Sequence, residues 1–405
     1  MGPLSCRGTA ISTYSAPPGQ ATAKHRERPI LSDARTTTQQ VSLPQAFGMA
    51  QSKHMAGDLD GARQIYENIA RAAPDHVDTL IMLTSIGYRQ GHDAEARANL
   101  ARAIELARAG VQRQPADMRS RAALVNFLLA QGRPGEAEAW IDGLVLPLNP
   151  IRSDPGEFQA RREAAIARGL PPLIISTLPK SASESIWNKL AQGLGLAQCY
   201  FSIGLFPDCC VVPSRVAEVA KGGVAVKEHI GPTPHNVATL CKAGIDRLIV
   251  HHRDPRQAAL SWAHFVRDDV GQRVMGPLWR KIVPPAGVLA AGLGATIDWS
   301  IEHYLPLQTE FLADWRRIAA DPQIPLSVLF MSFESFRTEP EAYFARVLDF
   351  YDIPRADYAA GAEAETIHLR KGEIEEWRQV FSEAQRQRAW QMIPPDMARE
   401  FAWEF

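Results

Sequence analysis

Residues 179–185, PKSASES, are the first group whose types and spacing could do chemistry. An apolar run, Leu173 to Ser176, precedes them as a buried strand would, and a helix-like segment follows. A loop in this place can direct backbone N–H groups at an anion, and the helix dipole and the Lys180 ammonium add positive charge. The loop lacks the Walker A pattern G-x-x-x-x-G-K-[ST]. It is either a phosphate-type site or an ordinary strand–turn–helix with a surface lysine.

A second cation, Arg253, ends the apolar run RLIVHHR. Ser261 follows eight residues later, about two helical turns on, so it can face the same pocket. Between them, Asp254 is expected as a helix N-cap and Pro255 in the first turn. The pair predicts an anion site, although a helix cap with a locally satisfied arginine is an equal alternative.

Lys227, Glu228 and His229 follow a third strand-like run in GGVAVKEHIGPTP. A histidine at the carboxyl end of a strand, beside a lysine, is a candidate general base. Glu228 is the competing base. Adjacent residues of an extended chain point in opposite directions, so only one of the two faces the site, and we favour His229.

Two further cations, Arg370 and Lys371, stand with Gly372 before an amphipathic segment in HLRKGEIEEWRQVF. They could complete an anion site, or they could form an exposed basic turn.

The elements that must position these residues are short apolar runs separated by helix-like stretches. We expect strands at 173–176, 223–227, 247–251 and 326–331. This alternation predicts an α/β fold, a parallel sheet flanked by helices on both faces. Ligands of such folds bind at the carboxyl ends of the strands, where the candidate residues lie.

The N-terminal part has a different pattern. Residues 1–40 are rich in small and polar residues without periodicity and are expected to be a disordered tail. Residues 41–150 have helical periodicity with three similar breaks, each a Gly followed five residues later by an Ala. The first two glycines are 34 residues apart and the third follows after 41. The segment resembles tetratricopeptide repeats, with a generic antiparallel helical bundle as the alternative. The pairs are Gly57 and Ala62, Gly91 and Ala96, and Gly132 and Ala137.

Composition limits the function classes. The chain has 405 residues, which favours two domains, and its net charge of −1 does not favour nucleic-acid binding. Five cysteines without a C-x-x-C pair give neither a disulfide framework nor a zinc site. No run reaches the length of a membrane span, and the N-terminus lacks an apolar signal-peptide core. We expect a cytoplasmic protein that needs no metal.

Taken together and in order, the four groups resemble the motifs of sulfotransferases that use 3′-phosphoadenosine 5′-phosphosulfate (PAPS). PKSASES is similar to that family's PKSGTTW, and VKEHIG to its VKTHLP. Arg253, Ser261 and SWAHF are similar to its arginine, serine and YYHF, with the spacing kept. RKGEIEEW resembles its RKG-x-x-G-D-W-K, and SFES places Phe333 at an aromatic position that reaches the adenine. The resemblance covers about 171–395.

Three positions depart from the family pattern. Ala182 stands where the family has Gly, and Glu184 where it has a second Thr. Ser185 aligns with the tryptophan that stacks on adenine, and Trp187 lies two positions later. A carboxylate near a phosphate is unfavourable unless it points away or pairs with a cation.

The resemblance implies a sulfotransferase domain over 151–405, a P-loop-like turn and transfer of a sulfonate from PAPS, leaving 3′-phosphoadenosine 5′-phosphate (PAP). It implies that Lys180 stabilises the leaving phosphate, that His229 is the general base and that Lys227 lies beside the transferring group. The implied donor-binding residues are Lys180, Ser181, Ala182, Ser183, Glu184, Ser185, Arg253, Ser261, Phe333, Arg370, Lys371 and Gly372.

Two other classes stay open. One is a repeat scaffold with a degenerate nucleotide-binding domain, and the other is a kinase-like P-loop enzyme. The acceptor could be a glycolipid, a saccharide, a phenol or a protein, and the repeats could bind a peptide. The long segment 268–305, expected to be irregular, and the region 200–215 are expected to shape the acceptor pocket.

Overall fold

The structure, a computed structural model, describes residues 41–268, 282–359 and 371–405. The expected tail over 1–40, Arg370 and the first part of the expected acceptor segment lie outside the described residues.

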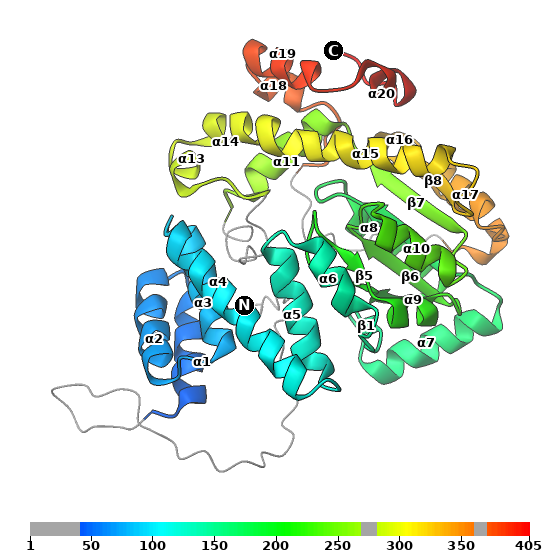
Figure 1. Ribbon diagram of the computed structural model, residues 1–405. Helices are drawn as coiled ribbons and strands as arrows, with labels where there is room; N and C mark the ends of the chain where they lie inside the picture. Colours follow the sequence, from blue (N-terminus) through cyan, green and yellow to red (C-terminus); the bar gives the residue numbers. More distant parts are fainter. Residues whose placement is uncertain (1–40, 269–281, 360–370) are drawn as a thin grey trace, which may run out of the picture.

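A six-stranded sheet forms the centre of the C-terminal part (Figure 1). Neighbouring strands are parallel except at one edge, where β1 runs antiparallel to β3. The four strands expected from the sequence are confirmed, and the sheet has two further strands that were not expected, β1 at one edge and β3 beside it. The strands, in spatial order, are β1 (Asn149–Pro150), β3 (Ala197–Tyr200), β6 (Val224–Glu228), β2 (Leu173–Thr177), β7 (Arg247–His252) and β8 (Ser327–Ser332).

Alternating side chains of the central strands enter two cores on opposite faces of the sheet. On β2, Ile174 joins one core, whereas Leu173 and Ile175 join the other. This alternation follows from the period of two along a strand, and helices cover both faces as the apolar runs require. One face packs mainly against α9 (Pro213–Val219), α10 (Pro234–Lys242), α11 (Pro255–Phe265) and α15 (Leu305–Ala320). The other packs mainly against α8 (Ser183–Leu194), α16 (Phe333–Thr338) and α17 (Pro340–Phe350).

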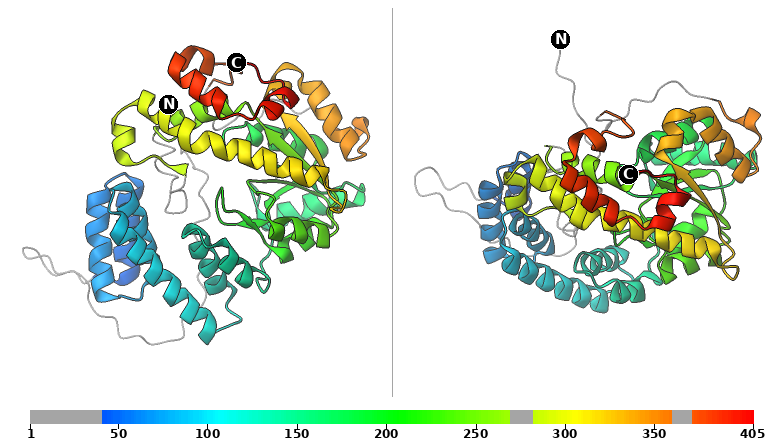
Figure 2. Two further views of the ribbon diagram at one scale, coloured as in Figure 1. Left: turned by 45° about the horizontal axis from the view of Figure 1, so that its top comes forward. Right: turned by 90° about the horizontal axis from the view of Figure 1, so that it is seen from above.

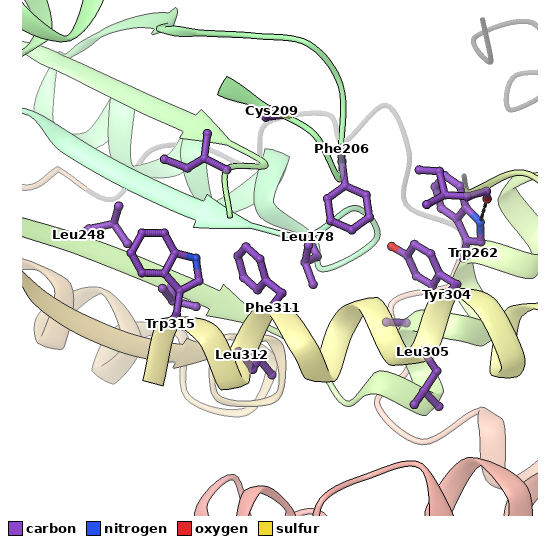
Figure 3. Close-up of a cluster of buried hydrophobic side chains, with 14 of the residues drawn as sticks. Leu178, Phe206, Cys209, Leu248, Trp262, Tyr304, Leu305, Phe311, Leu312 and Trp315 are labelled. Atoms are coloured by element: carbon purple, nitrogen blue, oxygen red, sulfur yellow. Dashed lines mark hydrogen bonds between the residues drawn. The ribbon is translucent and has the colours of Figure 1, made fainter. Parts of the chain in front are cut away.

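Aromatic residues of α15 fill much of the first core (Figure 3). Phe311 and Trp315 point from this helix towards the sheet, and Leu248 of β7 lies in the same cluster. The remaining helical elements of the C-terminal part are α7 (Pro155–Ala167), the 3₁₀ turn η3 (Arg355–Asp357), α18 (Trp377–Val380), α19 (Glu383–Gln391) and α20 (Pro395–Glu400).

The N-terminal helices stand beside the sheet domain in an arc (Figure 2). Gly57, Gly91 and Gly132, the glycines of the three similar breaks, all have positive φ at the turns between paired helices. Ala96 packs so closely on α3 that a Cβ added at Gly87 would lie 3.1 Å from its Cβ. The helices are α1 (Leu43–Met55), α2 (Leu59–Ala72), α3 (Val77–Arg89), α4 (Asp93–Arg113), α5 (Met118–Ala130) and α6 (Pro134–Ile141).

A short ribbon of the C-terminal part, β4 (Ser202–Ile203) and β5 (Cys210–Val211), docks on α5. Ile203 and Cys210 complete the apolar core of the third helix pair. Gly204 lies at the contact with φ +89°, and a Cβ there would lie 2.7 Å from Leu129 Cδ1. The ribbon therefore joins the two parts of the chain through packing as well as through the linker.

The expectation of an irregular segment over 268–305 is wrong for its second half. Residues 286–304 form α13 (Ala286–Ala290), α14 (Leu293–Trp299) and the π-helical turn η2 (Ser300–Tyr304). The glycines that favoured a loop include Gly292, which makes the turn between α13 and α14 with φ +100°. Across the described ranges, no helix is both long and apolar enough to cross a membrane.

Candidate functional site

The candidate residues meet at the carboxyl edge of the sheet. The central strand β2 lies between β6 and β7, and the chain passes from β6 on one side of it to β7 on the other. Loops that follow strands on either side of such a switch point diverge and leave room for a ligand. Lys180 follows β2, His229 follows β6 and Arg253 follows β7, so three separate sequence motifs are brought to one edge.

The backbone of the loop after β2 is anchored by its carbonyl groups. Ser181 donates through Oγ to the carbonyl of Leu178, 2.8 Å away, and this Oγ also lies 2.6 Å from Thr177 Oγ1. The Tyr304 hydroxyl donates to the carbonyl of Pro179 at 2.8 Å. These bonds make the first carbonyls of the loop point towards the interior of the protein.

Two residues at the end of β7 anchor the next carbonyls. Arg253 Nη1 donates to the carbonyl of Lys180 at 3.1 Å, and His251 Nε2 donates to that of Ser181 at 2.8 Å. The C=O and N–H of one trans peptide unit point in opposite directions. The N–H groups that follow these carbonyls therefore point away from the side chains that anchor the carbonyls. Because a carbonyl only accepts, Nε2 of His251 carries the proton, and Nδ1 accepts from the Tyr343 hydroxyl 3.0 Å away.

The loop conformation is that of an anion-binding turn. Lys180 has φ +70° and Ala182 φ +65°, both left-handed, and α8 begins at Ser183. Successive N–H groups in such alternating conformations form a concave nest of positive potential, continued by the first N–H groups of α8. The N–H of Ser185, further along this turn, donates to the Ala182 carbonyl at 3.1 Å. The Lys180 ammonium lies 4.5 Å from the centre of the Phe265 ring. Ala182 occupies a conformation that favours glycine, which explains the Gly of the resembled motif.

Lys227 carries a buried positive charge beside this loop. Its ammonium pairs with the Glu184 carboxylate, whose other oxygen lies 3.1 Å from Arg152 Nη2. Burial favours the neutral form of both partners, yet the pairing prevails: the pKa of Glu184 is lowered and that of Lys227 is raised. The sequence departure at Glu184 is thus compensated by two cations, as the electrostatic argument required.

His229 has the tautomer of a general base. Its Nδ1 lies 2.8 Å from the carbonyl of Thr177. A carbonyl only accepts, so Nδ1 carries the proton and Nε2 keeps its lone pair. Burial, and then the Lys227 charge, lower the pKa of His229 to about 3, so the imidazole is neutral at physiological pH.

Glu228 is turned away from His229 and is engaged elsewhere. Its Oε1 accepts from the backbone N–H groups of Phe201 at 2.6 Å and of Ser202 at 2.9 Å. Its Oε2 accepts from the Ser202 hydroxyl at 2.6 Å. Burial raises the pKa of Glu228 despite these donors. This carboxylate anchors the segment after β3, in keeping with the alternation argument that favoured His229.

Arg253 is buried against the other motif residues. Its guanidinium lies 3.9 Å from the Phe333 ring centre, and Nη2 donates to the carbonyl of Glu373 at 2.7 Å. The second bond brings the C-terminal basic segment to the end of β7. Ser261, two turns along α11, is also buried, and Asp254 caps that helix as expected.

The remaining expected donor residues have mixed positions. Lys371 is exposed and pairs with Glu376 at 3.0 Å, and Gly372 has φ +69°. Arg370 lies outside the described residues. Trp187 is fully buried and donates to the Ala225 carbonyl at 2.9 Å, so it belongs to the core and leaves no face for an adenine.

Sequence reasoning missed Tyr304, His251 and Arg152. His251 stands two residues before Arg253 on a strand, and this could have marked it as a loop neighbour. Tyr304 and Arg152 lie in unrelated segments, and only the tertiary structure brings them to the site.

A hollow of about 410 Å³ lies at the opposite, amino-terminal edge of the sheet. Two of its lining side chains, Arg247 and Asp352, pair with each other at 2.7 Å. It contains none of the motif residues and lies at the edge where ligands of open parallel sheets do not bind.

Comparisons with known proteins give distant similarities. No family model matches the chain, and no curated protein matches it. Among solved structures, mouse sulfotransferase SULT7A1 in complex with PAP is similar, with 14% identity and a TM-score of 0.41, over 63% of this chain and 98% of that chain. A mutant O-GlcNAc transferase of Thermobaculum terrenum is similar with 12% identity and a TM-score of 0.23, over 88% of this chain and 94% of that chain.

Proposed function

We propose that this chain is a sulfotransferase that moves a sulfonate group from PAPS to an acceptor hydroxyl or amine. The observation that carries the proposal is the anchored loop 178–182. The carbonyls of residues 178–181 are held by four side chains, which come from the loop itself, from η2 and from the end of β7. The loop N–H groups are thus left for an anion, next to a neutral histidine and a buried lysine.

The proposed transfer is an in-line displacement at sulfur. The acceptor oxygen or nitrogen forms a bond to sulfur while the bond from sulfur to the phosphate oxygen breaks. His229 takes the acceptor proton at Nε2, and Lys180 stabilises the charge that develops on the leaving phosphate. The N–H groups from Ser181 to Glu184 hold the 5′-phosphate, and Lys227 lies beside the sulfonate.

Selection of PAPS over other nucleotides is assigned to the 3′-phosphate. Arg253, Ser261, Lys371 and the Gly372 N–H would hold it, together with Arg370, and Phe333 would contact the adenine. The bond from Arg253 to the Glu373 carbonyl supports this grouping, because it joins two of the motifs directly. The proposed chemistry requires no metal, since lysines and N–H dipoles supply the positive charge.

Calorimetry with PAP, AMP and ATP tests the proposal. We expect PAP to bind at least roughly tenfold more tightly than AMP, because only PAP carries the 3′-phosphate. ATP binding with phosphoryl transfer would instead support a kinase-like enzyme, and binding of none of the three would support a scaffold.

Turnover of labelled PAPS against panels of phenols, saccharides, glycolipids and peptides then identifies the acceptor. Replacement of Lys180 or His229 by Ala should lower turnover by roughly two to four orders of magnitude. Lys221→Ala, on an exposed side chain, is the matched control and should keep full turnover. Near-normal turnover in either site variant rejects that residue's role.

The same proposal covers the organisation of the chain. Residues 41–150 would form tetratricopeptide-like repeats and 151–405 the catalytic domain of a cytoplasmic protein, after a tail over 1–40. A peptide or protein would bind the repeats. Pull-down of a labelled peptide library on the 405-residue chain, with and without acceptor competition, tests this assignment.

A further inference from the structure

One carboxylate of the site has no counterpart in the resembled motif and is shared between two cations. Glu184 pairs with Lys227 through one oxygen and lies 3.1 Å from Arg152 through the other. The Lys227 side chain is 8% exposed, whereas those of Glu184 and Arg152 are each 33% exposed. A buried ammonium requires an anionic partner, and Glu184 supplies it.

Arg152 is held in place independently of Glu184. Its Nη1 donates to Asn188 Oδ1 at 2.6 Å, and Gln198 Nε2 donates to the same oxygen at 3.0 Å. Arg152 comes from the linker after β1 and has φ +60°, a conformation uncommon for a residue with a side chain. Such a conformation persists where surrounding contacts enforce it, often at functional sites. The linker therefore places a second cation beside Glu184.

Aromatic rings complete the surroundings of Lys227. Its ammonium lies 5.7 Å from the Trp187 ring centre and 5.8 Å from that of Tyr200. These rings can support a cation but cannot neutralise it. Any anion that reaches Lys227 must therefore replace the Glu184 oxygen or share the ammonium with it.

We infer that Glu184 is a built-in counter-ion that holds the place of the ligand's anionic group at Lys227. When a phosphoryl or sulfonate oxygen binds there, Lys227 turns to it, and Glu184 stays paired with Arg152 alone. Arg152 thus acts as a positioning residue that keeps the displaced carboxylate away from the anion. The inference rests on the proposed function for the identity of the ligand, but the exchange of anions at Lys227 does not.

Affinity for PAP in a double-mutant cycle of Glu184 and Arg152 tests the exchange. Glu184→Gln removes the competing carboxylate, so PAP should bind roughly tenfold more tightly. Arg152→Gln leaves the carboxylate without its second cation, so PAP should bind roughly tenfold more weakly. In the Glu184→Gln background, Arg152→Gln should change the affinity by less than about twofold.

The exposed pair Glu157 and Arg161 on α7, 2.9 Å apart, is the matched control. Glu157→Gln and Arg161→Gln should leave PAP affinity unchanged. If PAP binds the native protein but binds Glu184→Gln no more tightly, or if Arg152→Gln changes PAP affinity equally in both backgrounds, the inference is overturned.

A second arm works without PAP. In the ligand-free protein, Glu184→Gln should lower Tm because it leaves Lys227 unpaired, and the double variant Glu184→Gln, Lys227→Met should recover Tm. Inorganic sulfate should raise the Tm of Glu184→Gln more than that of the native protein. If sulfate shows this difference and PAP does not bind, the exchange stands and the proposed sulfotransferase function fails. If sulfate shows no difference, the exchange itself is rejected, whatever PAP does.

Discussion

The hydroxyl of Tyr304 donates to the carbonyl of Pro179 across 125 positions of the chain, at 2.8 Å. Tyr304 ends the π-helical turn η2, and its ring stacks on Trp262 with centres 4.7 Å apart (Figure 3). π-helical turns are rare and occur often at functional sites. Trp262 follows Ser261 directly, so one stack links the loop after β2 to α11 and to the second half of the expected acceptor segment.

Tyr304→Phe should weaken PAP binding by roughly tenfold while the protein stays folded, because the ring keeps its packing and only the loop anchor is lost. Tyr351→Phe is the matched control: its hydroxyl accepts from the Ile174 N–H at 3.1 Å in the core, far from the loop. Calorimetry and thermal unfolding should show similar losses of stability in both variants and a loss of affinity in Tyr304→Phe alone. Equal affinities in the two variants would contradict the anchoring role.

Ala182→Gly should stabilise the protein by about 0.5–1 kcal/mol, because glycine adopts the left-handed φ of +65° without a Cβ clash. Ala160→Gly, at an exposed position in the middle of α7, should destabilise the protein by a similar amount, since glycine weakens a regular helix. Urea unfolding of the two variants measures both changes. A destabilising Ala182→Gly would show that the loop does not hold this conformation in solution.

Glu228→Gln should destabilise the protein by about 1–3 kcal/mol but keep the pH dependence of turnover. The carboxylate accepts from Phe201 and Ser202, and an amide has only one oxygen to offer them. His229→Asn should instead abolish the base and lower turnover by orders of magnitude. A pH–rate profile of both variants distinguishes the two candidate bases, and loss of the acidic limb in Glu228→Gln would reverse the assignment.

Acid should destabilise the fold between pH 7 and 5. Burial lowers the pKa of His229 and His252 to about 3 and that of His251 to about 4. The unfolded chain takes up protons near pH 6.5 and the folded chain does not, so each histidine costs about 2 kcal/mol of stability as pH falls to 5. Burial also raises the pKa of Glu334 to about 7. The folded chain therefore binds this proton more readily than the unfolded chain, which adds about 2 kcal/mol of stability as the pH falls to 5. Because three histidines oppose one glutamate, the net effect of these four groups is a loss of stability as the pH falls.

Urea unfolding at the two pH values measures this loss. His252 contacts Phe401 and Trp403 and lies outside the loop contacts, so His252→Gln should reduce the pH dependence by about 2 kcal/mol whatever its effect at pH 7. Stability that is unchanged between pH 7 and 5 would show that these imidazoles are not buried in the neutral form.

Gly204→Ala should loosen the contact between the N-terminal helices and the ribbon. Its Cβ would lie 2.7 Å from Leu129 Cδ1 and 2.8 Å from the Asp208 carbonyl, in a backbone conformation that disfavours side chains. Limited proteolysis should cleave the linker near residues 142–148 faster than in the native protein. Gly135→Ala, with no heavy atom within 4 Å of the added Cβ, is the control. The same cleavage rate in both would mean that the ribbon does not hold the two parts together.

Much of the fold could be predicted from local pattern. The runs at Leu173, Val224 and Arg247 were recognisable because buried parallel strands need apolar side chains on both faces. The helix caps at Asp254 and the turn glycines were recognisable because few residue types satisfy those conformations. The prediction over 286–304 failed, since glycine and proline there shape short helices rather than a loop.

The sequence by itself determined which residues stand at strand ends, because the period of two and the cap residues are properties of neighbouring positions. It also determined that Glu184 needs a cation, because an isolated carboxylate beside an anion site is unfavourable. Only the tertiary structure decided which cations those are and that Tyr304 anchors the loop. Lys227 lies 43 positions from Glu184 in the sequence, and Tyr304 lies 125 positions from Pro179. Residues so far apart in the chain are brought into contact only by the order of strands in the sheet and the packing of helices on it.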